Sequence, residues 1–336
     1  LFPAWETLPF ERVSPTLHTM GQRIKVAWEL QNSKNPKVVI SPIRAVTQIV
    51  APNNEIQPIQ ISLNETIDLQ DTLEKLIQMG YRRVAQIENR GEVANRGSIL
   101  DIYPTTAEAP IRIDLWGDEV ERLGQFSISD QLTTSKKEKM WIFPARELLP
   151  SEAVKERASN LASTAPWGLP HWEKIARGET FNGMESWLPW IVEREETILD
   201  YLPNRSRVFF IDPDRSKRKV EEISRDESRI IPVLSQTWDI GTEALSKRLH
   251  VTFEKIFAQL PATSISAFSE IEGLPALRAQ NRQTAANSPE LELGDFLTQG
   301  YSVYAAANSK KSKPAFISLI ERTGLQATPS KEGGII

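Results

Sequence analysis

Two stretches near the start of the chain place apolar residues at helical spacing. In residues 20–30 they alternate with arginine, lysine and glutamate in a pattern that predicts a helix. In residues 69–77 leucine and isoleucine stand at positions i, i+4, i+7 and i+8, and Gly80 follows. Glycine commonly ends a helix, so the sequence predicts a second, amphipathic helix that stops at Gly80.

Beyond residue 80 the spacing of apolar positions changes to a period of two. Strands are predicted at residues 81–87, 97–103, 111–116 and 119–127, and short turn-like segments connect them. Alternating strands joined by short connections predict an antiparallel meander. Residues 59–143 are therefore predicted to form one small domain of helix plus antiparallel sheet.

A different pattern, a short and continuous apolar run, occurs at residues 37–42, 207–213 and 300–306. Such runs are typical of strands that are buried on both faces of a parallel sheet flanked by helices. The predicted fold class is α/β, with a doubly wound parallel-sheet domain. One sheet shared between residues 1–58 and 144–336 would leave the small domain as an insertion.

The last region also carries helical patterns and one irregular segment. Helices are expected at residues 148–162, 169–176 and 184–188, and helical sequence resumes at residue 215. Residues 264–292 are polar and rich in proline and alanine, which predicts a loop.

The composition excludes several kinds of site. The 336 residues include no cysteine and three histidines, which argues against disulfides, thiolate metal sites and a three-histidine zinc site. A net charge of -4 gives no general attraction to nucleic acid. The chain has no membrane-length apolar run and no signal peptide, so we expect a cytoplasmic protein without membrane partners. The absence of an initiator methionine suggests a piece of a longer protein.

Catalytic motifs are not found where an α/β protein would carry them. The sequence has no phosphate-binding G-x-x-x-x-G-K-[ST] string, no G-x-G-x-x-G and no G-x-S-x-G. Asp212 ends a predicted strand, the position of a magnesium-holding carboxylate in nucleotide sites, yet a helix N-cap explains it better. The basic run at residues 215–219 is offset by nearby acidic residues and is expected to be a solvated helix face rather than a phosphate site.

The predicted strand at residues 111–116 carries the most informative pattern. Its odd positions are aliphatic and face the predicted core, which leaves Arg112 and Trp116 on the polar face. Arg96 opens the preceding strand and could extend that surface. Tryptophan and arginine are enriched at protein-binding hot spots, so a protein-binding face is one interpretation. The other is a tryptophan that packs over its neighbours at a domain boundary.

Longer strings resemble the bacterial transcription-repair coupling factor family. Residues 91–104 read G-E-V-A-N-R-G-S-I-L-D-I-Y-P, and residues 2–9 read F-P-A-W-E-T-L-P; both resemble family stretches. Residues 111–120, 126–131 and 142–147 follow in the family's order and spacing. The resemblance is clear to about residue 215 and looser to about residue 325.

The resemblance implies a domain architecture like that of the excision-repair helicase UvrB. A P-loop-like α/β domain would be split into parts 1A and 1B, with residues 1–58 as the end of 1A and 144–336 as 1B. Residues 59–143 would be the inserted domain 2, which binds UvrA in the family.

It also implies a function and a set of site residues. The module would recruit UvrA to stalled RNA polymerase during transcription-coupled nucleotide excision repair. Arg96, Arg112 and Trp116 fall on the family's two arginines and one aromatic of the UvrA-binding surface, and the best-known members carry phenylalanine as that aromatic. Asp212 and Asp214 would be a degenerate Walker B position without catalysis.

Other activities of the family would lie outside these residues. RNA polymerase, double-stranded DNA, ATP and magnesium would be bound by parts of the whole protein that this chain lacks, so no cofactor or metal is expected here. A UvrB-type helicase fragment with ATP-dependent binding of damaged DNA is the alternative. Residues 10–15 leave no room for a DNA-inserting hairpin, and residues 212–215 read D-P-D-R in place of D-E-x-H, so the coupling factor is favoured.

Overall fold

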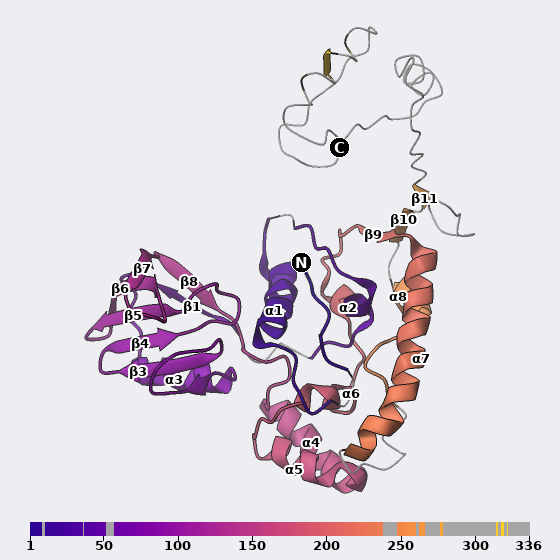
Figure 1. Ribbon diagram of the computed structural model, residues 1–336, viewed down its shortest axis with the longest axis horizontal. Helices are drawn as coiled ribbons and strands as arrows, with labels where there is room; N and C mark the ends of the chain where they lie inside the picture. Colours follow the sequence, from indigo (N-terminus) through magenta and orange to yellow (C-terminus); the bar gives the residue numbers. More distant parts are fainter. Residues whose placement is uncertain are drawn as a thin grey trace. The chain divides into compact units, whose positions relative to one another are not determined.

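The computed structural model describes most of the chain up to residue 277. The described residues are 1–8, 11–35, 37–51, 57–237, 247–259, 262–265 and 276–277, together with positions 314, 317, 318 and 321. Residues Leu1–Leu277 form one compact unit (Figure 1). It is a mixed α/β protein, in agreement with the predicted class.

The middle of the chain builds a six-stranded sheet with the order β2-β3-β4-β5-β6-β7. Neighbouring strands run antiparallel except β2 and β3, which are parallel. A separate two-stranded ribbon pairs β1 (Ile59–Ser62) with β8 (Lys139–Ile142). The strands of the main sheet are β2 (Arg82–Arg83), β3 (Glu92–Arg96), β4 (Ile99–Ile102), β5 (Ile111–Trp116), β6 (Glu119–Phe126) and β7 (Thr133–Lys136).

Helix α3 (Leu69–Gln78) packs on one face of this sheet. The Asp68 side chain accepts a hydrogen bond from the backbone N–H of Asp71, which caps the first turn, and Gly80 follows the last turn with φ +87°. Leu73 and Leu76 of the helix join the inward side chains of β3, β4, β5 and β6 in one buried cluster. The predicted helix and its stop are therefore confirmed.

The strand predictions in this region are confirmed in part. Strand β5 has the predicted bounds, and the predicted strands at 97–103 and 119–127 contain β4 and β6. The strand predicted at 81–87 is limited to Arg82–Arg83, and β3 was not predicted. Strand β3 begins at Glu92, a buried carboxylate that accepts hydrogen bonds from Arg82 and from the backbone N–H groups of residues 88 and 89. The strand was missed because its sequence, E-V-A-N-R, is largely polar. Its first residue is nevertheless buried, since these hydrogen bonds satisfy the carboxylate.

The last region combines helices with a small parallel sheet, and the sheet order is β11-β10-β9. The predicted helices at residues 148–162 and 169–176 correspond to α4 and α5, and helical turns are also present at 184–191. The elements are α4 (Glu152–Thr164), η1 (Pro166–Gly168), α5 (Leu169–Ala176), η2 (Met184–Trp187), α6 (Leu188–Ile191), η3 (Ile198–Tyr201), β9 (Val208–Ile211), α7 (Pro213–Thr237), α8 (Phe253–Gln259), β10 (Ala262–Ile265) and β11 (Ala276–Leu277).

Two predictions about this sheet need correction. Strand β9 is buried on one face only, because Phe210 is buried whereas Phe209 and Ile211 are exposed. The loop predicted at 264–292 is wrong at residues 264–265 and 276–277, which lie in β10 and β11. These short strands pair through backbone groups, so polar side chains do not prevent them. The rest of that loop and the strand predicted at 300–306 lie outside the described residues.

The strand predicted at residues 37–42 is wrong. Val38 and Ile40 are exposed, and residues 37–42 belong to no strand in the described part of the chain. A backbone hydrogen bond runs from the N–H of Phe2 to the carbonyl of Ile40 at 2.9 Å. Within the described residues the first region therefore adds no strand to the parallel sheet.

The first and last regions share a hydrophobic core instead. The first region supplies α1 (Leu17–Asn32) and α2 (Ile43–Thr47), so the helix predicted at 20–30 is confirmed. Trp5 and Ile49 pack in one buried cluster with Trp172, Trp187 and other apolar residues of the last region. This packing joins two chain segments between which the residues of the six-stranded sheet lie in the sequence.

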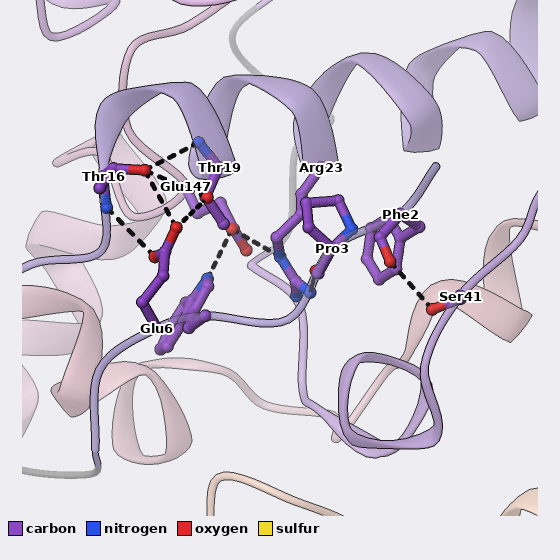
Figure 2. A network of polar contacts seen from close by, with 9 residues as sticks. Phe2, Pro3, Glu6, Thr16, Thr19, Arg23, Ser41 and Glu147 are labelled. Carbon is purple, nitrogen blue, oxygen red and sulfur yellow. Dashed lines mark hydrogen bonds and ion pairs between the residues drawn. The ribbon is translucent and has the colours of Figure 1, made fainter.

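A buried polar network links α1 to the segment after β8 (Figure 2). Arg23 of α1 donates from Nε to Oε1 of Glu147 at 2.7 Å, and the Trp5 indole N–H donates to the same oxygen at 2.7 Å. Arg23 also donates from Nη1 to the carbonyl of Pro3 at 2.8 Å and lies over the Phe2 ring. Burial raises the pKa of Glu147, although the Arg23 charge opposes this shift. The centre of the network is therefore a buried ion pair.

No helix in the described part of the chain combines the length and the apolar character that a bilayer crossing requires.

Candidate protein-interaction site

Strand alternation divides the six-stranded sheet into a core face and an outer face. On β5 the side chains of Ile111, Ile113 and Leu115 are buried in the core, as predicted. Arg112 and Trp116 stand at the intervening positions, and thus on the outer face. The predicted alternation of this strand is therefore confirmed.

Two arginines on the outer face share one buried carboxylate. Asp101 of β4 lies opposite Arg112 in the antiparallel register, and Asp101 is 1% exposed. Arg112 donates from Nε to Oδ1 of Asp101 at 2.7 Å and from Nη2 to Oδ2 at 2.9 Å. Arg96, at the end of β3, donates from Nη2 to Oδ2 of Asp101 at 2.7 Å. We call these three residues the arginine cluster.

Arg112 makes further contacts that fix it in place. Its guanidinium donates to the backbone carbonyl of Gln131 at 3.0 Å and to the Gln131 side-chain oxygen at 3.2 Å. It also lies 4.4 Å from the centroid of the Phe126 ring. The hydrogen bonds to Asp101 raise the pKa of Arg112 above its usual value. Arg112 therefore braces β4 and β5 to the segment between β6 and β7, and only 16% of its side chain is exposed.

Arg96 and Trp116 are the accessible members of the predicted site. The Arg96 side chain is 45% exposed, and Trp116 is 79% exposed at the tip of the β5–β6 hairpin. Gly117 forms the turn with φ +62°, a conformation that favours glycine. Such exposure argues against the interpretation of Trp116 as a packing residue, although its role in binding stays a prediction.

The structure brings two of the three predicted residues together. Arg96 and Arg112 meet at Asp101, whereas Trp116 lies four residues along β5 from Arg112, about 13 Å at the usual strand rise. Sequence reasoning did not single out Asp101 or Gln131 as site residues. Asp101 stands at a polar position between buried Leu100 and Ile102, so period-two alternation could have found it.

Asp212 and Asp214 lie elsewhere, at the end of β9 and in the first turn of α7. The Asp212 N–H donates to the carbonyl of Ile265 at 2.7 Å. Its side chain accepts from the N–H of Arg215 at 3.4 Å, the geometry of a helix N-cap. Across the described residues, no group of three or more acidic or histidine side chains is arranged to hold a metal ion. The capping interpretation agrees with this geometry, and the degenerate Walker B assignment stays a prediction.

Comparison with known proteins gives two consistent results. Residues 59–148 match the family model described as the UvrB interaction domain, a range that contains the whole arginine cluster and Trp116. The transcription-repair-coupling factor of Mycobacterium tuberculosis is 32% identical over 259 residues, which cover 72% of this chain and 21% of that protein. The proteins of the same name from Haemophilus influenzae and Escherichia coli are 26% and 24% identical; each match covers 84% of this chain and 26% of that protein.

The chain thus spans about a fifth to a quarter of the length of the curated relatives that it matches. The match extends well beyond the residues of the domain model, since it covers about three quarters or more of this chain. Over the residues compared, the chain therefore belongs to the family of bacterial transcription-repair-coupling factors, and its residues 59–148 match the UvrB interaction domain.

Proposed function

We propose that this chain is a docking module of transcription-coupled repair, in which the outer face of the six-stranded sheet binds UvrA. Recruitment of UvrA would bring the excision-repair machinery to a stalled RNA polymerase. The proposal rests on the resemblance of Arg96, Arg112 and Trp116 to the family's UvrA-binding residues. It is supported by the domain match over residues 59–148.

One observation carries the proposal: a highly exposed tryptophan stands on the same sheet face as a preorganised arginine cluster. A tryptophan that is 79% exposed gains much when a partner covers it, because aromatic side chains bury about 150–250 Å² each. Arg96 is held by Asp101 before any partner arrives, so less side-chain entropy is lost on binding. Exposed tryptophan and fixed arginine, here on one face of the sheet and about 13 Å apart along β5, are residue types enriched at binding hot spots.

The direct test compares Trp116→Ala and Arg96→Ala in the full chain for affinity to purified UvrA by calorimetry. Each variant is expected to weaken binding about tenfold or more. Trp116→Ala should leave the melting temperature within about two degrees, since its side chain is highly exposed, whereas Arg96→Ala should also lower the melting temperature because it removes one arginine partner of buried Asp101. Arg83→Ala, at an exposed arginine on β2, is the matched control and should bind as the wild type does. Unchanged affinity in both test variants would refute the proposal.

The result for Arg112→Ala in the same assay has to be interpreted differently. Its replacement by alanine would leave Asp101 buried with one arginine partner fewer, so a loss of stability is expected together with a loss of affinity. Affinity lost in Arg112→Ala therefore has less diagnostic value than affinity lost in Trp116→Ala.

We further propose that this chain does not hydrolyse nucleotides by itself. The Asp212 carboxylate caps α7, and the sequence lacks a phosphate-binding loop. The purified chain should show no magnesium-dependent ATPase activity, and Asp212→Ala should change nothing in that assay. Hydrolysis that Asp212→Ala abolishes would favour the UvrB-type helicase instead. RNA polymerase and DNA would bind through parts of the whole protein beyond these residues.

A further inference from the structure

The segment between β6 and β7 lies against the arginine cluster and has no assigned role. Both oxygens of Gln131, its carbonyl and its side-chain Oε1, accept hydrogen bonds from Arg112. Leu132 is the next residue, so its Cα lies about 3.8 Å from that of Gln131. Leu132 is 65% exposed, and among residues 57–150 it and Trp116 are the two most exposed large apolar side chains.

Hydrogen bonds fix the backbone of this segment at Leu132 and at Gln131 before it. The Leu132 N–H donates to Oδ1 of Asp130 at 3.0 Å, and its carbonyl accepts from the N–H of Ser127 at 2.9 Å. Gln131 adopts φ +61°, which is rare for a residue other than glycine, and its Nε2 donates to the carbonyl of Ile128 at 3.0 Å. Strained backbone that the surroundings hold in place is concentrated at binding sites.

The size of a stable interface requires more contacts than the predicted residues supply. A specific interface buries about 800 Å² on each partner, whereas one tryptophan contributes at most about 250 Å². Arg112 is largely covered, and Arg96 is about half exposed. Additional contact area must therefore come from neighbouring exposed side chains.

We infer that residues 127–132 form a second contact segment for the same partner, with Leu132 as its apolar contact and Arg112 as the brace that holds it. This inference rests on the proposed function, because it assigns more residues to that surface. The partner surface carries an apolar pocket for Leu132 and carboxylates that face the arginines. Arg96 and Arg112 share the carboxylate of Asp101, and the charge of Asp114 also acts on Arg112, so the 45% exposed Arg96 is the arginine that a carboxylate of the partner can reach.

The bonds that fix Leu132 also reduce the entropy cost of docking. A side chain on a rigid backbone loses less freedom on binding than one on a mobile loop. The backbone N–H of Leu132 and the Ser127 hydroxyl lower the pKa of Asp130, because both hydrogen bonds favour its ionised form. Asp130 is therefore a positioning residue for Leu132.

Leu132→Ala tests the inference in the full chain, with affinity for purified UvrA and the melting temperature measured together. The expected result is an affinity lower by about fivefold or more with an unchanged melting temperature, as for an exposed apolar contact in an interface. Val233→Ala in α7 is the matched control, because Val233 is an aliphatic side chain with 64% exposure outside the sheet. The control should bind as the wild type does.

Trp116→Ala, measured beside it, separates the two levels of the argument. If Trp116→Ala weakens binding while Leu132→Ala stays within twofold of the wild type, the second contact segment is refuted and the proposed function stands. If neither variant weakens binding, the second contact segment is refuted, and the proposed function is refuted with it when Arg96→Ala also binds as the wild type does. Asp130→Ala adds a readout of positioning: affinity should fall about threefold through slower association, and an unchanged association rate would overturn the role of Asp130.

Discussion

Replacing Arg23 by methionine removes the cation of the buried network in Figure 2 while keeping a side chain of similar length. Arg23 and Glu147 have side chains that are 1% and 3% exposed, and their closest atoms are 2.7 Å apart. After the substitution the Glu147 carboxylate keeps the Trp5 indole as a hydrogen-bond donor but loses its counter-charge. The perturbation therefore leaves one negative charge buried.

The magnitude follows from the cost of such a charge. Breaking a buried ion pair by removing one partner costs about 3–5 kcal/mol, so Arg23→Met is expected to lower the free energy of unfolding by about 4 kcal/mol. Glu147→Gln should cost about 3 kcal/mol, the lower end of that range, because it leaves the Arg23 guanidinium buried without a counter-charge while the glutamine Oε1 can still accept its hydrogen bond. The double variant has no buried charge and should cost about 4 kcal/mol, which implies a coupling of about 3 kcal/mol.

The assay is urea unfolding of the full chain at pH 7, followed by tryptophan fluorescence, for the wild type, both single variants and the double variant. Lys155→Met is the matched control, because Lys155 and Glu152 form an ion pair at 2.8 Å whose side chains are far more exposed. The control should change the free energy of unfolding by less than about 1 kcal/mol. The reasoning is refuted if the double variant equals the sum of the singles within about 0.5 kcal/mol, or if Arg23→Met costs no more than the control.

Three further predictions concern other buried or constrained residues. Burial, with the nearby charges of Lys174 and Arg12, lowers the pKa of His171 from 6.5 to about 4, so the unfolded chain binds a proton that the folded chain rejects. Stability should therefore fall by about 2 kcal/mol from pH 8 to pH 5, and His171→Phe should flatten the urea midpoints over that range; an identical slope would contradict this. Asp101→Asn should cost about 2 kcal/mol or more in thermal unfolding, because it weakens the hydrogen bonds to both arginines, and a melting temperature equal to that of the wild type would count against the cluster. Gly91→Ala should cost about 2–3 kcal/mol, since φ is +79° and a Cβ would overlap the Leu17 side chain; a loss below about 1 kcal/mol would show that this contact relaxes easily.

The parts of the fold that could be predicted are those whose pattern is local. Strand β5 alternates between buried aliphatic and outward polar residues, so its bounds and its core face followed from six residues. Helix α3 was predictable for the same reason, because its apolar positions, the Asp68 cap and the Gly80 stop all lie within thirteen residues. In a half-buried helix or strand, the alternation of apolar and polar residues itself shows which face is exposed to solvent.

The errors occurred where pairing depends on distant chain segments. The apolar run at residues 37–42 resembles a buried strand, yet the segment pairs with no strand in the described residues and exposes Val38. Strand β10 shows the opposite case, since its polar sequence pairs with β9 through backbone groups. The residue types of a segment do not show whether a partner strand is available, because strands pair through backbone groups that nearly every residue carries.

The candidate site shows the same division. Strand alternation and family resemblance each assign a role to a single position of the sequence. They could therefore select Arg96, Arg112 and Trp116. Asp101 acts through the cross-strand register that sets it opposite Arg112, which depends on how the hairpin pairs. The contribution of Gln131 depends on a left-handed backbone conformation that residues other than glycine seldom adopt, so strand alternation does not mark it.

The arrangement around Asp101 has a consequence for how the proposed docking would distribute its energy. The arginines are ordered during folding, so docking does not have to fix them, and Arg96 keeps a guanidinium that is 45% exposed. A charge at the accessible Arg96 acts mainly on the association rate and its dependence on salt, whereas apolar burial at Trp116 acts mainly on dissociation. Arg96→Ala should therefore reduce the association rate more at 50 mM than at 300 mM salt, while Trp116→Ala should accelerate dissociation equally at both. A salt-dependent effect of Trp116→Ala, or a salt-independent effect of Arg96→Ala, would show that the charge does not steer the encounter and that both side chains serve only as contact area.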